Sequence, residues 1–195
     1  MPIKILSQEF YDNLAPNYDA TLKDPKIDAQ HVNEAAKIFQ QHNNATSGSI
    51  LDLGCGTGLL KDLLGDEFDY TGIDISEEML KRASDRGYQT IHKPVEDALS
   101  EIPDRSYDFV FVLGTLLFVE DIDSILKDIE RIARQSILLS LDEVTEEYKR
   151  NFSLEVYNHF QVEFPNTKED YFIRGWTSPT TGITIKTRMI YMEKK

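Results

Sequence analysis

The sequence of 195 residues is of a length typical of one domain, and its 41% hydrophobic content is enough for a sizeable core. Asp and Glu number 34 against 21 Lys and Arg, and a net charge of −13 would repel a nucleic-acid backbone or an anionic membrane surface. We therefore expect neither of those as a partner.

Cys55 is the only cysteine, which excludes an intrachain disulfide and fits a reducing compartment. No apolar stretch is long enough for a signal peptide or a membrane span. The four histidines are scattered without the spacing of metal ligands. These features predict a soluble, cytoplasmic protein without a metal site.

The first 48 residues precede the first expected strand and are helical in pattern. Phe10, Tyr11 and Leu14 form one apolar patch, which we expect Pro16 to end, so that residues 17–19 form a loop or short turn. A longer helix is expected to follow, with Asp28 as its cap. Its apolar face is Val32, Ala35, Ala36 and Phe39.

Residues 50–60, ILDLGCGTGLL, are the most informative stretch of the chain. An apolar run bounded by glycine is consistent with a buried parallel strand, and leucines at helical spacing follow it. Thr57 is the expected helix N-cap and Gly65 the expected left-handed end. Glycines between strand and helix allow the backbone to approach a ligand closely and to direct N–H groups at it.

The spacing of the glycines narrows the choice of ligand. A dinucleotide fingerprint needs a small residue where this chain has Leu59, and the Lys and Ser/Thr of a phosphate-binding loop are missing. The pattern Asp52-x-Gly54-x-Gly56-x-Gly58 instead resembles motif I of the class I S-adenosylmethionine-dependent methyltransferases. The resemblance implies that the cofactor contacts Asp52, Gly54, Cys55 and Gly56 of this chain. A glycine turn without a ligand is the alternative.

Two further stretches support the resemblance. Residues 10–19 contain the pattern FYDxxAxxYD, similar to an N-terminal arm that folds over the cofactor in small-molecule methyltransferases, so Tyr18 is expected at the cofactor and Tyr11 at the acceptor. Asp74 ends a second expected strand, 20 residues after Gly54, where a carboxylate can accept from both ribose hydroxyls. Ser76 is the natural cap of the following helix. Ile75 and Met79 are expected to press on the adenine.

A third strand is expected at residues 89–92 and a fourth at 109–113, which residues 103–108 lead into. The resemblance places Glu96 in the slot that accepts from the adenine amino group, with Asp97 after it, in a register that could slip by one or two positions. Leu113 and Gly114 would lie beside the methionine part of the cofactor. Where many relatives carry a histidine, this chain has Leu117 and Phe118, which we assign to the acceptor pocket.

The remaining pattern predicts a helix opening at Asp121, a fifth strand at 136–141 and a terminal hairpin of strands from residue 171. Residues 144–162 fit one helix, or a short helix and an irregular segment. The fold class is thus α/β, a Rossmann-like doubly wound sheet, mostly parallel with a C-terminal antiparallel hairpin. We divide the single domain into an N-terminal arm (1–48), a cofactor-binding core (49–142) and a C-terminal part (143–195).

The resemblance implies methyl transfer from S-adenosyl-L-methionine to a small-molecule acceptor by a monomer or homodimer. Tyr11, Tyr18 and Asp142 are candidate bases by expected location alone. Two alternatives stay open: a non-catalytic cofactor-binding module acting through a protein partner, and another transfer, such as aminopropyl transfer, on the same fold. Neither the acceptor nor a catalytic residue follows from the sequence.

Overall fold

The computed structural model describes residues 7–22, 30–146, 149, 155–164, 169–177 and 184–194. The strands are β1 (Gly48–Leu53), β2 (Phe68–Asp74), β3 (Gln89–His92), β4 (Tyr107–Val112), β5 (Ala133–Asp142), β6 (Glu169–Thr177) and β7 (Thr184–Glu193). The helices are α1 (Ser7–Leu22), α2 (Gln30–His42), α3 (Leu59–Leu64), α4 (Glu77–Asp85), α5 (Val95–Glu101), α6 (Ile122–Ile132) and a short 3₁₀ turn, η1 (Leu116–Phe118).

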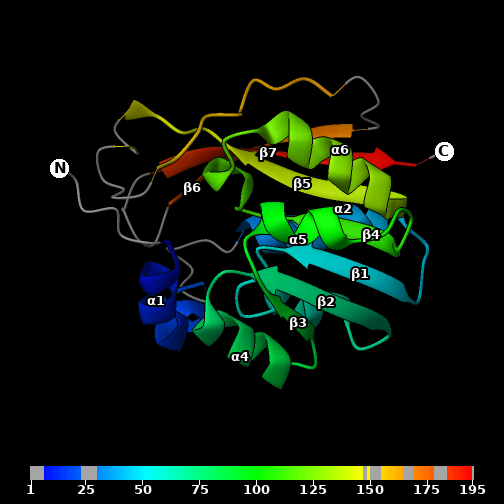
Figure 1. The fold of residues 1–195 in the computed structure, drawn as a ribbon. Helices are drawn as coiled ribbons and strands as arrows, with labels where there is room; N and C mark the ends of the chain where they lie inside the picture. The colour runs from blue at the N-terminus through cyan, green and yellow to red at the C-terminus, as the bar shows by residue number, and fades with distance from the viewer. Residues whose placement is uncertain are drawn as a thin grey trace.

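All seven strands join one sheet in the order β3-β2-β1-β4-β5-β7-β6. Strands β1 to β5 pair in parallel, whereas β7 is antiparallel to both β5 and β6. The predicted doubly wound sheet and its C-terminal antiparallel pair are confirmed (Figure 1). The order turns back between β1 and β4, so the carboxyl ends of these two strands border the switch point, where such sheets bind their ligands.

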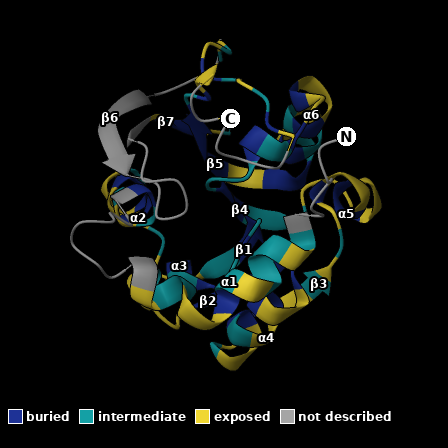
Figure 2. Ribbon diagram, turned by 90° about the vertical axis from the view of Figure 1, so that its left-hand side faces the viewer, coloured by how far each residue is buried: buried dark blue, intermediate teal, exposed yellow. Residues whose placement is uncertain are grey.

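The sheet separates two apolar cores. In β1, Leu51 and Leu53 belong to the core that includes residues of α5 and α6, whereas Ile50 belongs to the core that includes residues of α2, α3 and α4. Alternation along a strand sends neighbouring side chains to opposite faces, which explains why the buried residues 50–53 are apolar except for Asp52. Helices consequently cover both faces of the sheet (Figures 1 and 2).

Helix α1 lies at the carboxyl ends of β1 and β2, the side toward which their arrowheads point (Figures 1 and 2). Contrary to the expected break, α1 continues through Pro16 to Leu22, so residues 17–19 are helical. A proline inside a helix costs about 3 kcal/mol, since a hydrogen bond is lost and the ring crowds the preceding turn. Contacts of Asp12 and Asp19 with the core, one on each side of Pro16, hold the helix together.

Other elements agree with the sequence except in detail. The third strand, Gln89–His92, and the Asp121 cap of α6, which accepts from the Ser124 amide at 3.1 Å, are confirmed. The prediction of Thr57 as the N-cap of α3 was wrong, because Gly58 occupies that position. The Thr57 hydroxyl instead donates a hydrogen bond to Asp19 of α1. Residues 155–164 are not helical, which favours the irregular alternative there. Asp28 and the hairpin turn at 178–183 lie outside the described residues.

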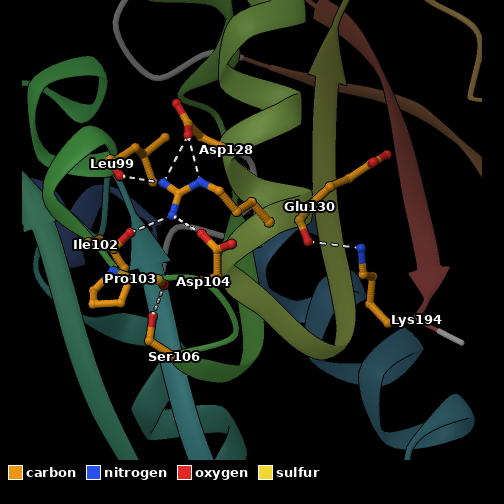
Figure 3. Close-up of polar contacts among 9 residues, drawn as sticks. Leu99, Ile102, Pro103, Asp104, Ser106, Asp128, Glu130 and Lys194 are labelled. Carbon is orange, nitrogen blue, oxygen red and sulfur yellow. Dashed lines mark hydrogen bonds and ion pairs between the residues drawn. The ribbon is translucent and has the colours of Figure 1, made fainter.

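Arg131 in α6 ties the helices on one face together. Its guanidinium donates to the Leu99 and Ile102 carbonyls at 3.0 and 2.6 Å and pairs with Asp104 and Asp128 (Figure 3). The Leu99 carbonyl also accepts from the Ile102 amide at 3.2 Å, so Arg131 adds a second donor there and supplies one to the Ile102 carbonyl at the helix end. This brace fixes the loop that leads into β4. In the described ranges, no helix has the length and apolarity needed to cross a membrane.

Candidate functional site

The loop between β1 and α3 carries three glycines in left-handed conformations. Their φ values are +69° at Gly54, +52° at Gly56 and +79° at Gly58, a region that other residues rarely adopt. The Gly54 and Cys55 amides donate to the Ile73 carbonyl of β2 at 2.7 and 3.1 Å. The loop is therefore fixed against the end of the neighbouring strand, with its backbone exposed to close approach.

Asp74 lies between this loop and the start of α4. Its Oδ2 accepts from the Gly56 amide and its Oδ1 from the Ser76 amide, both at 2.9 Å. Burial raises the pKa of the Asp74 carboxyl, while the Ser76 and Gly56 amides oppose that effect. The expected neighbour relation between the second-strand carboxylate and the glycine loop is present, and Ser76 caps α4 as predicted by accepting from the Met79 amide at 3.1 Å.

Asp52 is a second carboxyl in this region, with only 4% of its surface exposed. The Tyr88 hydroxyl donates to its Oδ2 at 3.0 Å. Burial raises the Asp52 pKa to about 7; the Tyr88 hydrogen bond lowers it and the charge of Asp74 raises it. Near neutral pH, Asp52 therefore exchanges between its neutral and charged forms.

Helix α1 closes over the two carboxyls. The Tyr18 ring lies beside the glycine loop, since a Cβ added at Gly56 would be 3.6 Å from its Cε1. Burial raises the Tyr18 pKa to about 12, with smaller contributions from Asp74, Asp19 and Asp52. The Asp19 carboxylate accepts from the Thr57 hydroxyl at 2.6 Å and pairs with Arg86. These contacts hold the arm against the glycine loop and the end of α4.

The carboxyl end of β4 forms the other side of the site. Gly114 has a φ of +67° and donates its amide to the Ser140 hydroxyl at 2.8 Å. The Thr115 hydroxyl donates to the Leu53 carbonyl at 3.1 Å, which joins the ends of β4 and β1. Leu113, immediately before Gly114, is half-buried and packs against the core on the α2 side.

His31 in α2 also reaches this edge, which sequence reasoning missed. A Cβ at Gly114 would lie 3.8 Å from the His31 Nε2, although 83 positions separate the two residues (114 − 31). Burial lowers the His31 pKa to about 4, so the imidazole is neutral at neutral pH. The chain gives no local signal for this contact, because only the packing of α2 on the sheet creates it.

Of the remaining predicted residues, one group lies around η1 and the other at the start of α4. Tyr11 and Phe118 meet edge to face, with ring centroids 6.0 Å apart, and Leu117 is buried next to Phe118 in η1. Met79 is 1% exposed, whereas Ile75 is half-buried.

Glu96 and Asp97 are exposed in the first turn of α5. Burial raises the pKa of the Cys55 thiol well above its usual value, so the thiolate needed for nucleophilic chemistry is disfavoured. No group of three or more potential metal ligands occurs within the described part of the chain.

The arrangement suits a ligand with hydroxyl groups and a positive charge. Asp74 and Asp52 offer carboxyl oxygens, and the glycine loop and Gly114 offer backbone that a ligand can approach closely. Carboxylates accept hydrogen bonds from hydroxyl and ammonium groups, and charge-assisted bonds of this kind are stronger than neutral ones. The residues present thus fit a nucleoside ribose joined to a cationic amino-acid part.

Comparison with known proteins points in the same direction. Residues 51–139 match the family model described as "Methyltransferase domain". The chain is 30% identical over 100 residues to phosphatidylethanolamine N-methyltransferase of Cereibacter sphaeroides, an alignment that spans 48% of this chain and 49% of that protein. It is 29% identical over 141 residues to malonyl-[acyl-carrier protein] O-methyltransferase of Bacillus cytotoxicus, with 70% and 49% covered. The chain spans about half the length of these curated relatives.

Solved structures share the fold at low identity. Magnesium protoporphyrin IX methyltransferase from Synechocystis, solved with bound S-adenosylhomocysteine, has a TM-score of 0.63 at 16% identity, covering 96% of this chain and 98% of that one. The [4+2]-cyclase SpnF has a TM-score of 0.70 at 14% identity, covering 96% and 94%. Likeness at these identities concerns the fold alone, and the fold hosts more than one reaction.

Proposed function

We propose that this chain, which belongs to the class I S-adenosylmethionine-dependent methyltransferase family, transfers a methyl group from S-adenosyl-L-methionine to a small-molecule acceptor. The observation that carries the proposal is the meeting of Asp52, the glycine loop and Asp74 under helix α1 at the switch point of the sheet. The cofactor supplies a preformed electrophile, the methyl group on its sulfonium.

The residues of the chain would bind and orient the cofactor. Asp74 would accept hydrogen bonds from the ribose hydroxyls, using the lone pairs that its two amide donors leave available. Tyr18 in α1 would cover the ligand and exclude water, because its ring already lies beside Gly56. Holding the methyl group in line with an acceptor lowers the entropic part of the activation barrier. Much of the rate enhancement would come from this orientation.

The acceptor would bind near the end of β4. Tyr11 and Phe118 form an aromatic wall there, and Leu117 lies behind it. Of the candidate bases, Tyr18 is disfavoured by its pKa of about 12, and Asp142 is buried and accepts from the Thr187 hydroxyl. His31 lies beside Gly114, but a pKa lowered to about 4 makes its imidazole a weak base as well, so orientation rather than a base would supply most of the rate.

Several further expectations remain proposals. We place the arm at residues 1–48, the cofactor-binding core at 49–142 and the C-terminal part at 143–195, in a cytoplasmic monomer or homodimer. A non-catalytic cofactor-binding module is the alternative of a different class. Its signature would be tight cofactor binding without methyl transfer to any small acceptor.

A calorimetric titration with S-adenosylmethionine and S-adenosylhomocysteine tests the cofactor. Wild type should bind both, and Asp74→Ala should weaken binding by about 1–3 kcal/mol, as expected for a lost charge-assisted hydrogen bond. Asp69→Ala is the matched control, since Asp69 is an exposed carboxylate on the same strand, outside the site. Absence of binding by folded wild type would refute the proposed function.

A further inference from the structure

The third motif glycine, Gly58, makes room for an aromatic ring. A Cβ at Gly58 would lie 2.9 Å from Cε2 of Tyr88, and a Cβ at Gly72 in β2 would lie 2.8 Å from its Cδ1. Real side chains do not approach so closely, so both positions must be glycine for the ring to occupy this place. The two glycines belong to separate elements of the chain, but both border the Tyr88 ring.

The Tyr88 ring is fixed on its other side as well. It stacks on Tyr70 with centroids 5.0 Å apart and an interplanar angle of 30°, and only 5% of its surface is exposed. Its hydroxyl donates to Asp52 Oδ2 at 3.0 Å. A tyrosine held from several directions therefore controls where one oxygen of the Asp52 carboxyl lies.

We propose that Tyr88 is a positioning residue for cofactor binding: it holds Asp52 at the carboxyl end of β1 so that the second carboxyl oxygen accepts from the α-ammonium group of S-adenosylmethionine. This inference rests on the proposed function. Within the described residues, no hydrogen-bond donor to that second oxygen, Oδ1, is found. Asp52 ends a strand whose neighbours, β2 and β4, both contribute to the site.

Tyr88 also affects the charge of Asp52. Burial favours the neutral carboxyl, and the Tyr88 hydrogen bond favours the charged form that an ammonium group needs as partner. Of the other titratable groups nearby, Asp74 from β2 acts on Asp52, whereas Asp52 itself raises the pKa values of Tyr70 from β2, Cys55 from the loop and Tyr18 from α1. Of these, Asp74 opposes ionisation, so the Tyr88 hydroxyl is the group that counteracts burial.

The test is the affinity for S-adenosylmethionine, measured by calorimetry from pH 6 to 9 on wild type and Tyr88→Phe. Wild-type affinity should fall as the pH drops through about 7, where Asp52 gains a proton. Tyr88→Phe retains the ring and its stack but loses the donor, so the midpoint should move up by roughly one unit and the affinity at pH 7 should fall roughly fivefold. Above that range the affinity should largely recover.

Two controls separate positioning from structure. Tyr70→Phe removes the hydroxyl of the stacked partner, which donates to the Gly65 carbonyl at 2.9 Å and not to Asp52, so the pH profile should not move. The second control is 5′-methylthioadenosine, which lacks the α-ammonium group, and its affinity should be the same for wild type and Tyr88→Phe. Equal losses for both ligands would show a merely structural role and overturn the inference.

The outcomes also separate this inference from the proposed function. If folded wild type binds S-adenosylmethionine at no pH, the proposed function fails. If wild type binds and Tyr88→Phe has the same affinity and pH profile, the proposed function stands and the role of Tyr88 is wrong. Matching thermal unfolding curves of the two proteins would confirm that both are folded in the titrations.

Discussion

The Asp12 carboxylate of α1 accepts a hydrogen bond from the Ser76 hydroxyl at 2.6 Å, across 64 residues of sequence. The same oxygen accepts from the Glu78 amide at 3.2 Å. Ser76 caps α4 from within the chain, and Asp12 adds a second acceptor and a negative charge at the same helix N-terminus. The N-terminal arm is therefore part of the capping of a core helix.

Asp12→Ala should loosen the arm. We expect a loss of about 1 kcal/mol in the free energy of unfolding, as for a lost cap, and faster proteolytic cleavage within α1. Chemical denaturation and limited proteolysis measure the two effects. Asp85→Ala, at an exposed position of α4, is the control and should change neither. An Asp12→Ala protein as protease-resistant as wild type would contradict the role of Asp12 in docking.

The sheet was predictable because its strands are short apolar runs separated by turn residues and amphipathic helices. The break expected at Pro16 was wrong, since that expectation considered only the local cost of proline. Tertiary contacts by Asp12 and Asp19 compensate for that cost, and no local pattern reveals them. The assignment of Thr57 as a helix cap also considered the local sequence alone. In the folded chain its hydroxyl donates to Asp19 instead.

The site was predictable where its residues lie next to strand ends. The positions of Asp52, Asp74 and Gly114 follow from the rule that parallel strands present their carboxyl ends on one edge. Tyr88 and His31 could not be found in this way. Tyr88 depends on the space left by Gly58 and Gly72, which only the folded chain brings together.

Arg131→Ala should destabilise the face of the sheet covered by α5 and α6. The side chain is 30% exposed and its guanidinium bonds two carbonyls and two carboxylates, so we expect a loss of about 1–3 kcal/mol, mainly from the Ile102 carbonyl that loses this donor. Urea unfolding measures this loss. Lys127→Ala, an exposed residue of the same helix, should change stability by less than about 0.5 kcal/mol. Equal effects of the two changes would refute the bracing role.

His31 should make the protein less stable in acid. Its folded-state pKa of about 4 lies below the ordinary value of 6.5, so the unfolded chain binds a proton that the folded chain excludes. Stability from this group is complete above pH 6.5 and is lost as the pH falls toward 4, by roughly 3 kcal/mol. The difference in unfolding free energy between wild type and His31→Gln, measured at pH 7.5 and 4.5, should change in favour of the variant at low pH.

The control for that comparison is Thr90→Ala, since Thr90 is an exposed residue of β3 that carries no titratable group. Its difference from wild type should stay the same at both pH values. A His31→Gln difference that is independent of pH would show that the imidazole is solvated, and it would contradict the lowered pKa of His31.

Gly54→Ala should combine two separable costs. The φ of +69° strains any other residue, and an added Cβ would overlap the Thr115 hydroxyl and lie 2.9 Å from the Thr115 Cβ. Gly114→Ala isolates the first cost, because Gly114 has nearly the same φ, +67°, and an added Cβ there would make only an ordinary contact with the His31 Nε2, at 3.8 Å.

We expect Gly114→Ala to cost about 1 kcal/mol and Gly54→Ala at least about 1 kcal/mol more. A double-mutant cycle with Thr115→Ala tests the clash itself. Removing the Thr115 hydroxyl frees part of the space, so the two changes together should destabilise less than the sum of the single changes, by about 1 kcal/mol or more. Additive losses in thermal unfolding would mean that the backbone conformation alone requires glycine, and that Thr115 does not constrain the first residue of the loop.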